Sequence, residues 1–412
     1  MKTDLDRFMQ EKELDAILVT GPGQHNPAMV YMTGGCHLTN ADLIKIKGEQ
    51  AVLFHYPMER DEAAKSGLKT KNLAEYDFTA LLNQANGDYL RALVMRYKMM
   101  LEEVGLLSGK VAIYGRSEVG TNFEVFSALQ HEVPRISLLG ELINSSMMLA
   151  RMTKDAHEIE RIRQMGRITT QVVGLTADYI SSFVSKNDTL QKSNGEPLTI
   201  GDVKGRINLW LAELGAENPE GTIFAIGHDA GVPHSSGKAD DLLRLGQTIV
   251  FDIFPCEAGG GYFYDFTRTW CLGYAPDDVM ELYQTVLSIY NKVSAQLEAG
   301  KSFSHYQDMV CDLFAAKGHP TIKEDPQTQT GYVHSLGHGI GLNVHERPWS
   351  GISSDAKDCL FPGTVFTLEP GLYYPEKGMG VRLENSLWVQ SDGKIEILAD
   401  YPMDLVIPIK KG

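Results

Sequence analysis

The chain has 412 residues, of which 43% are hydrophobic, and carries a formal net charge of -15 at pH 7. A chain of this size can bury large cores in two or three domains. The acidic balance argues against a nucleic-acid partner and an anionic membrane surface, and no apolar run is long enough to span a membrane. The first residues lack the apolar centre of a signal peptide, so a cytoplasmic protein is expected.

The first part of the chain, residues 1–150, is expected to form a small α/β domain. Its pattern alternates between strands and amphipathic helices. The strand-like runs cover residues 16–19, 43–46, 51–54 and 111–114, and the helical patterns cover about 5–9, 78–104 and 121–131. No segment here carries a chemical signature, and the histidines at 25, 37 and 55 are expected in loops or on the surface.

A second domain, residues 151–412, is expected to follow. Asp155 with Glu158 three residues later forms a capping box, which predicts a long helix with a regular apolar period. Later helices are predicted at about 202–214, 277–298 and 304–317, among strand-rich segments. The five cysteines are scattered and form no CxxC pair, so neither a disulfide framework nor a cysteine zinc site is indicated.

The segment from Tyr332 to Pro348 places three histidines among three glycines. Gly337, Gly339 and Gly341 lie around His338, and residues without a Cβ let the backbone crowd around whatever that imidazole contacts. A glycine-rich loop with incidental histidines is the simpler interpretation of this segment alone. Carboxylates elsewhere in the second domain argue against it.

Four strand-like segments place a carboxylate among apolar neighbours. The four acids are Asp252, Asp265, Glu369 and Glu384. A buried acid costs several kcal/mol unless it is paired or bound to a metal. A surface position or a salt bridge would explain any one of them, but not the set together with His338. Four carboxylates and a neutral imidazole would be balanced by two divalent cations of a kind that accepts oxygen and nitrogen ligands.

These residues lie in longer motifs. In chain order the motifs are Val-Phe-Asp252, Tyr-Asp265-Phe-Thr-Arg-Thr, Gly-His338-Gly-Ile-Gly-Leu-Asn-Val-His345-Glu-Arg-Pro, Thr-Leu-Glu369-Pro-Gly-Leu-Tyr and Arg-Leu-Glu384-Asn. Residues 151–408 resemble the pita-bread metallopeptidases, which include Xaa-Pro aminopeptidases, Xaa-Pro dipeptidases (prolidases) and methionine aminopeptidases. The resemblance implies an α+β protein in which a C-terminal pita-bread domain follows a smaller creatinase-type α/β domain. That first domain argues against a methionine aminopeptidase, which generally lacks it.

The resemblance also implies a centre of two divalent metal ions. The metal ligands would be Asp252, Asp265, His338, Glu369 and Glu384. Asp265 and Glu384 would bridge the two ions, Asp252 would complete one site, and His338 with Glu369 would complete the other. Manganese is the expected metal, with cobalt, zinc or iron as alternatives.

The implied reaction is hydrolysis of the N-terminal Xaa-Pro bond of peptides or dipeptides by water that the two ions activate. Glu369 would accept the proton of that water, and His345 would hydrogen-bond the substrate or the tetrahedral intermediate. His234 would line the pocket and assist proton transfer or orientation, and Arg382 would fix Glu384. The expected partner is a peptide with proline at its second position, bound by a homodimer.

Other functions stay open at this point. A creatinase-like hydrolase that works without metal would not need the full acid set. A non-catalytic peptide-binding relative would show gaps among the ligands, and none is missing. Asp252 and Asp265 are thirteen positions apart, which exceeds the usual family spacing. A longer hairpin loop near the cleft is therefore expected, and its effect on substrate fit is undecided.

Overall fold

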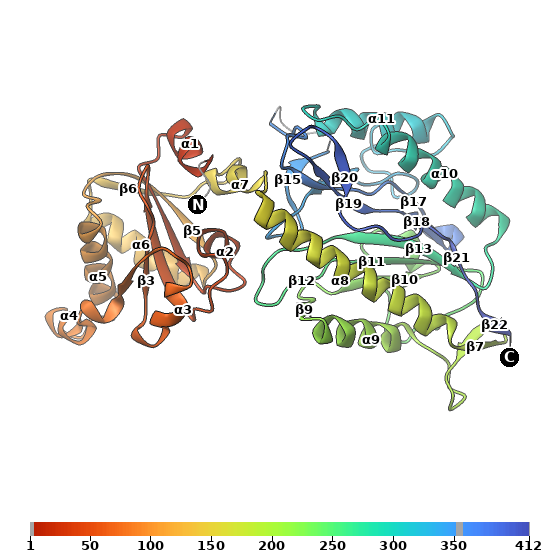
Figure 1. Ribbon diagram of the computed structural model, residues 1–412, viewed down its shortest axis with the longest axis horizontal. Helices are drawn as coiled ribbons and strands as arrows, with labels where there is room; N and C mark the ends of the chain where they lie inside the picture. Colours follow the sequence, from red (N-terminus) through yellow and green to blue (C-terminus); the bar gives the residue numbers. More distant parts are fainter. Residues whose placement is uncertain (1–3, 352–356, 412) are drawn as a thin grey trace. The chain divides into compact units, whose positions relative to one another are not determined.

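The computed structural model describes residues 4–351 and 357–411, and the chain divides into two compact units (Figure 1). The first unit comprises Met1–Arg151 with Gly259–Gly261, and the second comprises Met152–Ala258 and Tyr262–Gly412. Within the described ranges, no helix combines the length and the apolar character needed to cross a membrane.

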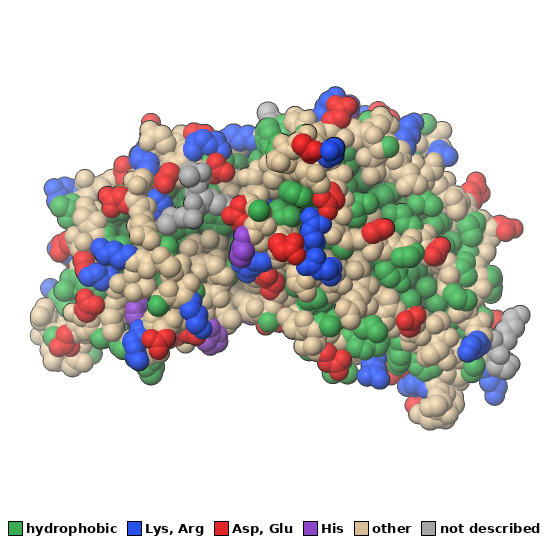
Figure 2. All heavy atoms as spheres, viewed as in Figure 1, with side chains coloured by type: hydrophobic (Ala, Val, Ile, Leu, Met, Phe, Trp, Pro, Cys, Tyr) green, Lys and Arg blue, Asp and Glu red, His purple; other side chains and the backbone are tan. Residues whose placement is uncertain are grey.

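Charged side chains are spread over the surface. On the face drawn in Figure 2, acidic and basic side chains are interspersed over both units. The net charge of -15 is therefore not gathered into one acidic patch on that face. Some of the carboxylates lie inside the second unit, where Asp265 and Glu384 are buried.

The first unit is built on a six-stranded sheet in the order β4-β3-β2-β1-β5-β6. The strands are β1 (Ala16–Gly21), β2 (Ala41–Ile46), β3 (Val52–His55), β4 (Lys69–Asn72), β5 (Gly109–Gly115) and β6 (Ile136–Leu139). The helices are α1 (Asp4–Glu11), α2 (Pro27–Thr33), α3 (Arg60–Ala64), α4 (Phe78–Gln84), α5 (Tyr89–Glu103), α6 (Val119–Glu132) and α7 (Ser146–Arg151). Strand β1 is apolar on both faces, because Ile17 and Val19 join one buried cluster while Ala16 and Leu18 join another. The sheet therefore has a core on each side.

Two expectations for this unit need correction. The helical pattern at 78–104 forms two helices, because Asn86 and Gly87 adopt positive φ angles of 54° and 83° between α4 and α5. His55 is buried, with 4% of its surface exposed, and its Nδ1 lies 2.8 Å from the carbonyl oxygen of Tyr56. His25 and His37 are exposed, as expected.

The second unit begins with the long helix that the capping box predicts. Helix α8 (Ala156–Ser181) follows Asp155, and the side chains of Asp155 and Glu158 each accept a hydrogen bond from the other's amide. The other helices are α9 (Ile200–Glu213), α10 (Asp277–Ser294) and α11 (Phe303–Ala315). Figure 1 shows α8 and α9 on one side of the strands and α10 and α11 on the other.

Two sheets of the second unit have the orders β10-β11-β13-β21 and β15-β14-β16-β19-β20, and β17 pairs with β18. Their strands are β10 (Thr222–Ile226), β11 (Thr248–Ile253), β13 (Phe266–Leu272), β14 (His338–Gly339), β15 (Glu346–Trp349), β16 (Val365–Leu368), β17 (Gly371–Tyr374), β18 (Met379–Arg382), β19 (Asn385–Val389), β20 (Ile395–Ile397) and β21 (Val406–Ile407). Smaller sheets contain β7 (Val184–Lys186), β8 (Thr189–Gln191), β9 (Ala216–Glu217), β12 (Cys256–Glu257) and β22 (Lys410–Lys411). Short 3-10 turns occur at Pro57–Glu59, Leu73–Glu75, Asp229–Gly231 and Pro375–Lys377.

The helices pack on the strands through apolar faces. Val286 of α10 and Val310 of α11 are buried in one cluster with Phe366 and Val381 of the strands. On the other helix pair, α8 makes a close approach at Gly166, where a Cβ would lie 2.7 Å from the Tyr264 ring. Contact this close leaves no room for a side chain at that position.

This close approach predicts opposite effects for two alanine substitutions in α8. Gly166→Ala should lower the free energy of unfolding by about 1–3 kcal/mol, because the new methyl group would overlap Tyr264 and also lie 2.8 Å from the Ala399 Cβ. Gly174→Ala is the matched control, since its Cβ would meet only the Tyr401 ring at 3.7 Å. It should be neutral or stabilise the protein by up to about 1 kcal/mol through helix propensity. Urea unfolding of both variants measures the difference, and equal stabilities would contradict the packing described.

Candidate metal centre and active site

Two of the five predicted metal ligands come from one β-hairpin. Asp252 lies near the end of β11, and Asp265 directly precedes β13. The strands pair antiparallel with Asp252 opposite Thr267, which brings the two carboxylates to the same end of the sheet. The longer chain between them continues the hairpin, and the amide of Glu257 donates to the carbonyl oxygen of Tyr262 at 3.0 Å. The extra residues therefore leave the register of the two acids intact.

Glu369 and Glu384 lie opposite each other at a break between two stretches of antiparallel strand pairing. Strands β16 and β19 pair as far as Leu368 and Asn385, and β17 and β18 resume pairing in the same register. Pro370 has no amide hydrogen to donate, so the ladder breaks beside Glu369. The two glutamates therefore occupy facing positions where strand hydrogen bonding stops.

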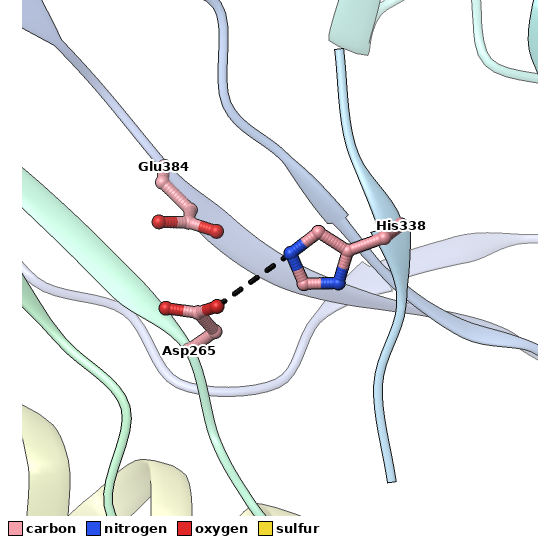
Figure 3. Close-up of side chains that lie close together, drawn as sticks. All are labelled: Asp265, His338 and Glu384. Carbon is pink, nitrogen blue, oxygen red and sulfur yellow. Dashed lines mark ion pairs between the residues drawn. The ribbon is translucent and has the colours of Figure 1, made fainter. Parts of the chain in front are cut away.

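His338 directs its Nε2 towards these acids. Its Nδ1 lies 3.0 Å from the carbonyl oxygen of Gly339, so the neutral ring carries its proton on Nδ1. Nε2 lies 3.7 Å from Asp265 Oδ2 and 3.4 Å from Glu369 Oε1. Figure 3 shows the side chains of His338, Asp265 and Glu384 converging from three segments of the second unit.

The glycines beside His338 are required by strand packing. A Cβ at Gly337 would lie 2.1 Å from the carbonyl oxygen of Thr367, and one at Gly339 would lie 1.9 Å from that of Arg347. Strands β15 and β16 thus approach β14 too closely for any side chain. At these two positions the crowding comes from neighbouring strands and not from a group bound to the imidazole, as the sequence had suggested.

Burial dominates the electrostatics of the cluster. It raises the pKa of Asp265 and of Glu384 well above the ordinary values, and the neighbouring carboxylates raise both further. Burial raises the pKa of Glu369 to about 7 and lowers the pKa of His338 to about 3. The protein alone therefore disfavours the charged forms of these acids, and a bound cation would favour them.

Two carboxylate oxygens test whether the site fits metal ions. Asp252 Oδ1 and Glu384 Oε1 are buried and have no hydrogen-bond partner among the residues that the structure describes. Ligand atoms of Asp265, His338 and Glu384 all lie within 4.8 Å of one another. Buried polar atoms are normally satisfied, and oxygen atoms next to an imidazole nitrogen are typical ligands of divalent cations. The donor set fits the ions that the motifs imply.

Arg382 pairs with a different acid from the one predicted. Its Nη2 donates to Asp252 Oδ2 in a buried ion pair. Glu384 Oε2 instead accepts from Thr267 Oγ1 at 2.7 Å, and Arg382 Nε lies 3.2 Å from that same hydroxyl oxygen. The prediction that Arg382 fixes Glu384 is wrong, because its guanidinium reaches across to β11 and meets Glu384 only through the threonine.

A phenol and a second imidazole extend this network. Tyr373 OH accepts from Arg382 Nη1 at 2.8 Å and lies 2.8 Å from His334 Nε2. Burial lowers the pKa of His334 to about 3, so the ring is neutral, and its Nδ1 lies 2.7 Å from the carbonyl oxygen of Ser335; Nε2 therefore accepts a hydrogen bond from the phenol. The sequence analysis gave neither residue a role. Their places within the motifs of His338 and Glu369 were the available signal.

The cluster lies at a cavity of about 590 Å³, and all eight of the predicted site residues line it. His234 follows the turn Asp229–Gly231, His345 precedes β15, and both are exposed. The ring centroids of His345 and His338 are 4.3 Å apart, and partial desolvation of the ring within the cavity lowers the pKa of His345. Apolar parts of the wall come from Ile223, Phe254, Val344 and Trp349. The cavity thus combines buried acids with two accessible imidazoles and an apolar wall.

Comparison with known proteins finds similarity over nearly the whole chain. Residues 160–391 match the model of metallopeptidase family M24. The chain is 25% identical to an uncharacterized peptidase, YqhT, of Bacillus subtilis over 96% of both chains. It is 24% identical to an Xaa-Pro dipeptidase of Pyrococcus furiosus over 94% of both chains. The crystal structure of an X-Pro aminopeptidase from Thermotoga maritima aligns with a TM-score of 0.73 at 23% identity, covering 95% of this chain and 97% of that chain.

The raised pKa values predict how metal-free protein responds to pH. A group whose pKa is raised by folding loses its stabilising contribution as pH rises through the folded value, which is about 7 for Glu369 and higher than usual for Asp265 and Glu384. The lowered pKa of His338 acts in the opposite direction, but only below its ordinary value of 6.5. Above about pH 6.5 the carboxylates act alone, so metal-free protein should become less stable as pH rises through about 7.

Thermal unfolding of chelator-treated protein with and without manganese measures this response. Manganese should raise the unfolding temperature more at the higher pH, because the ligands must be deprotonated to bind it. Asp265→Asn is the control variant, and it should show a smaller fall with pH and little response to manganese. A metal-free stability that stays constant or rises above about pH 6.5 would contradict the electrostatic account.

Proposed function

Because the chain belongs to metallopeptidase family M24, we propose that it hydrolyses the bond between the first residue of a peptide and a following proline, with two divalent ions as cofactor. As a member of this family the chain is a hydrolase. The observation that carries the finer proposal is the convergence of four carboxylates and His338 on one cavity.

Five residues would hold the ions: Asp252, Asp265, His338, Glu369 and Glu384. The two buried oxygens without hydrogen-bond donors in the described chain, and the direction of His338 Nε2, support this assignment. Bound divalent ions would polarise a carbonyl group as Lewis acids and lower the pKa of water. Arg382 keeps Asp252 in place through their buried ion pair.

The remaining chemistry belongs to side chains of the cavity. Glu369 accepts the proton of the attacking water at a carboxylate oxygen, and Thr367 Oγ1 orients that carboxylate from 3.1 Å. His345 donates a hydrogen bond to the substrate carbonyl oxygen as negative charge develops on it. His234 orients the substrate or passes a proton to the departing amine. The exposure of both imidazoles to the cavity supports these roles.

The proposed substrate is a peptide or dipeptide with proline second. Two of the similar proteins are named as an Xaa-Pro dipeptidase and an X-Pro aminopeptidase, which supports this class. The amide before proline is tertiary and the proline φ is fixed, so a cavity of fixed shape can select that bond over an ordinary extended peptide. The apolar wall residues Val344, directly before His345, and Trp349, four positions after it, suit a pyrrolidine ring.

Other parts of the proposal rest on the sequence. We propose manganese as the bound metal, a homodimer as the assembly and the cytoplasm as the location of the protein. Residues 1–150 would be a creatinase-type domain and residues 151–412 the catalytic domain. The division of the structure after Arg151 supports this assignment.

Matched peptides test the substrate proposal. Metal-stripped protein should not cleave Xaa-Pro or Xaa-Pro-Yaa peptides, and manganese or cobalt should restore cleavage with about two ions bound per chain. Met-Ala-Yaa should be a poorer substrate by product-release assay, because its second residue lacks the ring. Full activity in verified metal-free protein would point to a creatinase-like hydrolase, and no cleavage of any of these peptides would favour a binding role.

Alanine substitutions separate metal binding from the work of the two imidazoles. His234→Ala and His345→Ala should each lower kcat on the order of 10²-fold while metal content stays near normal, because each removes one hydrogen bond formed in the transition state. Asp265→Asn serves as the contrasting variant and should lose metal and turnover together. Metal analysis alongside kinetics gives the comparison, and loss of metal from either histidine variant would place that residue among the ligands.

A further inference from the structure

Two loops of the second unit meet beside the cluster. One is the part of the hairpin extension that belongs to this unit, residues 253–258 and 262–264, and the other is the turn 341–346 that carries His345. The amide of Phe263 in the first loop donates to the carbonyl oxygen of Gly341 in the second at 2.7 Å. Strand pairing fixes part of each loop, because Cys256 and Glu257 pair with β9 and Glu346 begins β15, and side-chain contacts position the remaining residues.

The first turns of α8 hold the hairpin extension. Tyr262 OH donates to the carboxylate of Glu158, which is buried. Arg161 binds Glu257 with two hydrogen bonds of 2.9 and 2.7 Å, and its guanidinium lies 4.7 Å from the centre of the Tyr262 ring. A two-point guanidinium–carboxylate contact fixes orientation as well as distance.

Lys154, two residues before α8, holds the other loop. Lys154 Nζ lies 3.3 Å from Glu346 Oε2, and their side chains are only 2% and 4% exposed. The other carboxylate oxygen, Glu346 Oε1, accepts from the amide of Asn343 at 3.0 Å and so closes the turn that precedes it. The pair fills the space beside Gly341, where a Cβ would lie 2.7 Å from Glu346 Oε2 and 3.0 Å from Lys154 Cε.

The lysine is itself held by the strands. Its amide donates to the carbonyl oxygen of Gly363 at 2.8 Å, and Thr153 forms a bridge with Thr364 just before β16. Lys154 therefore ties the turn 341–346 to the same strand that leads to Glu369. A buried ion pair of this kind contributes little net stability but strongly disfavours the loss of either partner.

We propose that Lys154 and Glu346 are positioning residues for His345, an inference that rests on the function proposed above for that imidazole. Glu346 follows His345 directly in the chain. One of its carboxylate oxygens accepts from the amide of Asn343 within the turn, and the other pairs with Lys154 outside the turn. If Glu346 shifts, the His345 ring moves relative to His338, whose ring centroid is now 4.3 Å away. A displacement of about 1 Å at a reacting group is enough to slow catalysis strongly.

Kinetics of three variants test this role. Lys154→Met and Glu346→Gln should each lower kcat for an Xaa-Pro peptide by about tenfold or more, with KM and metal content near those of the unchanged protein. Arg167→Met is the matched control on α8, because its ion pair with Glu160 is exposed on both sides, at 51% and 62%. It should leave kcat unchanged.

A double-substitution experiment separates positioning from general damage. In a His345→Ala background, Lys154→Met should lower kcat less than about twofold further, because the imidazole through which it acts is already gone. A further loss as large as in the unsubstituted background would overturn the proposal. An unchanged kcat in folded Lys154→Met protein would overturn it as well, and Glu346→Gln provides the same test if Lys154→Met does not fold.

A readout independent of the substrate distinguishes this inference from the proposed function. The imidazole carbon–hydrogen resonance of His345, identified by its disappearance in His345→Ala, should shift in Lys154→Met and stay in place in Arg167→Met. If the protein cleaves no Xaa-Pro peptide, the proposed function fails while the resonance still decides the positioning role. A resonance that does not move in either Lys154→Met or Glu346→Gln would refute it.

Discussion

The burial of like charges is the constraint on which the second unit depends. Asp252, Asp265 and Glu384 keep 8%, 5% and 2% of their surface exposed, and the Glu369 side chain keeps 15%. In a medium of low dielectric these carboxylates repel one another, and burial raises the pKa of Asp265, Glu369 and Glu384. Within the described chain, the guanidinium paired with this group is that of Arg382, and it is used on Asp252. The cluster is therefore held together by backbone register and by uncharged hydrogen-bond donors, and bound cations would favour its charged form.

The backbone meets this constraint by fixing each acid where a strand ladder starts, stops or breaks. Arg268 shows how far the fixing extends, because its guanidinium is fully buried and donates to carbonyl oxygens and an amide side chain. Its acceptors are the carbonyl oxygens of Thr267, Glu384, Tyr401 and Pro402 and the Oδ1 atom of Asn385. This arginine holds the backbone of Glu384 against β13 without neutralising its carboxylate. Arg382 thus compensates the charge of Asp252, whereas Arg268 fixes the backbone of Glu384.

The sequence predicted the family and the pita-bread α+β fold, and both are confirmed. The family was predictable because the acids lie in short motifs, and the pita-bread fold followed from that resemblance, whereas the helical periods and the capping box at Asp155 predicted single helices. The contacts that the sequence did not predict join distant segments. The Arg382–Asp252 pair spans 130 positions, and the hydrogen bond between His334 and Tyr373 spans 39. The need for glycine at 337 and 339 came from strands that pack across β14, which no local pattern encodes.

The acids and the accessible imidazoles are supported by different means. The acids lie at strand ends, so the register that places them is shared by the whole sheet and is insensitive to what the loops do. His345 lies in a turn, and its position depends on Lys154, Glu346 and the amide of Phe263. Extra residues inserted between Asp252 and Asp265 lengthen the hairpin beyond the paired strands, where Glu158 and Arg161 hold them. A change in that loop can therefore alter the cavity wall that faces the substrate, while the strand register that places the acids is unchanged. In this way one set of acids can serve cavities of different shape.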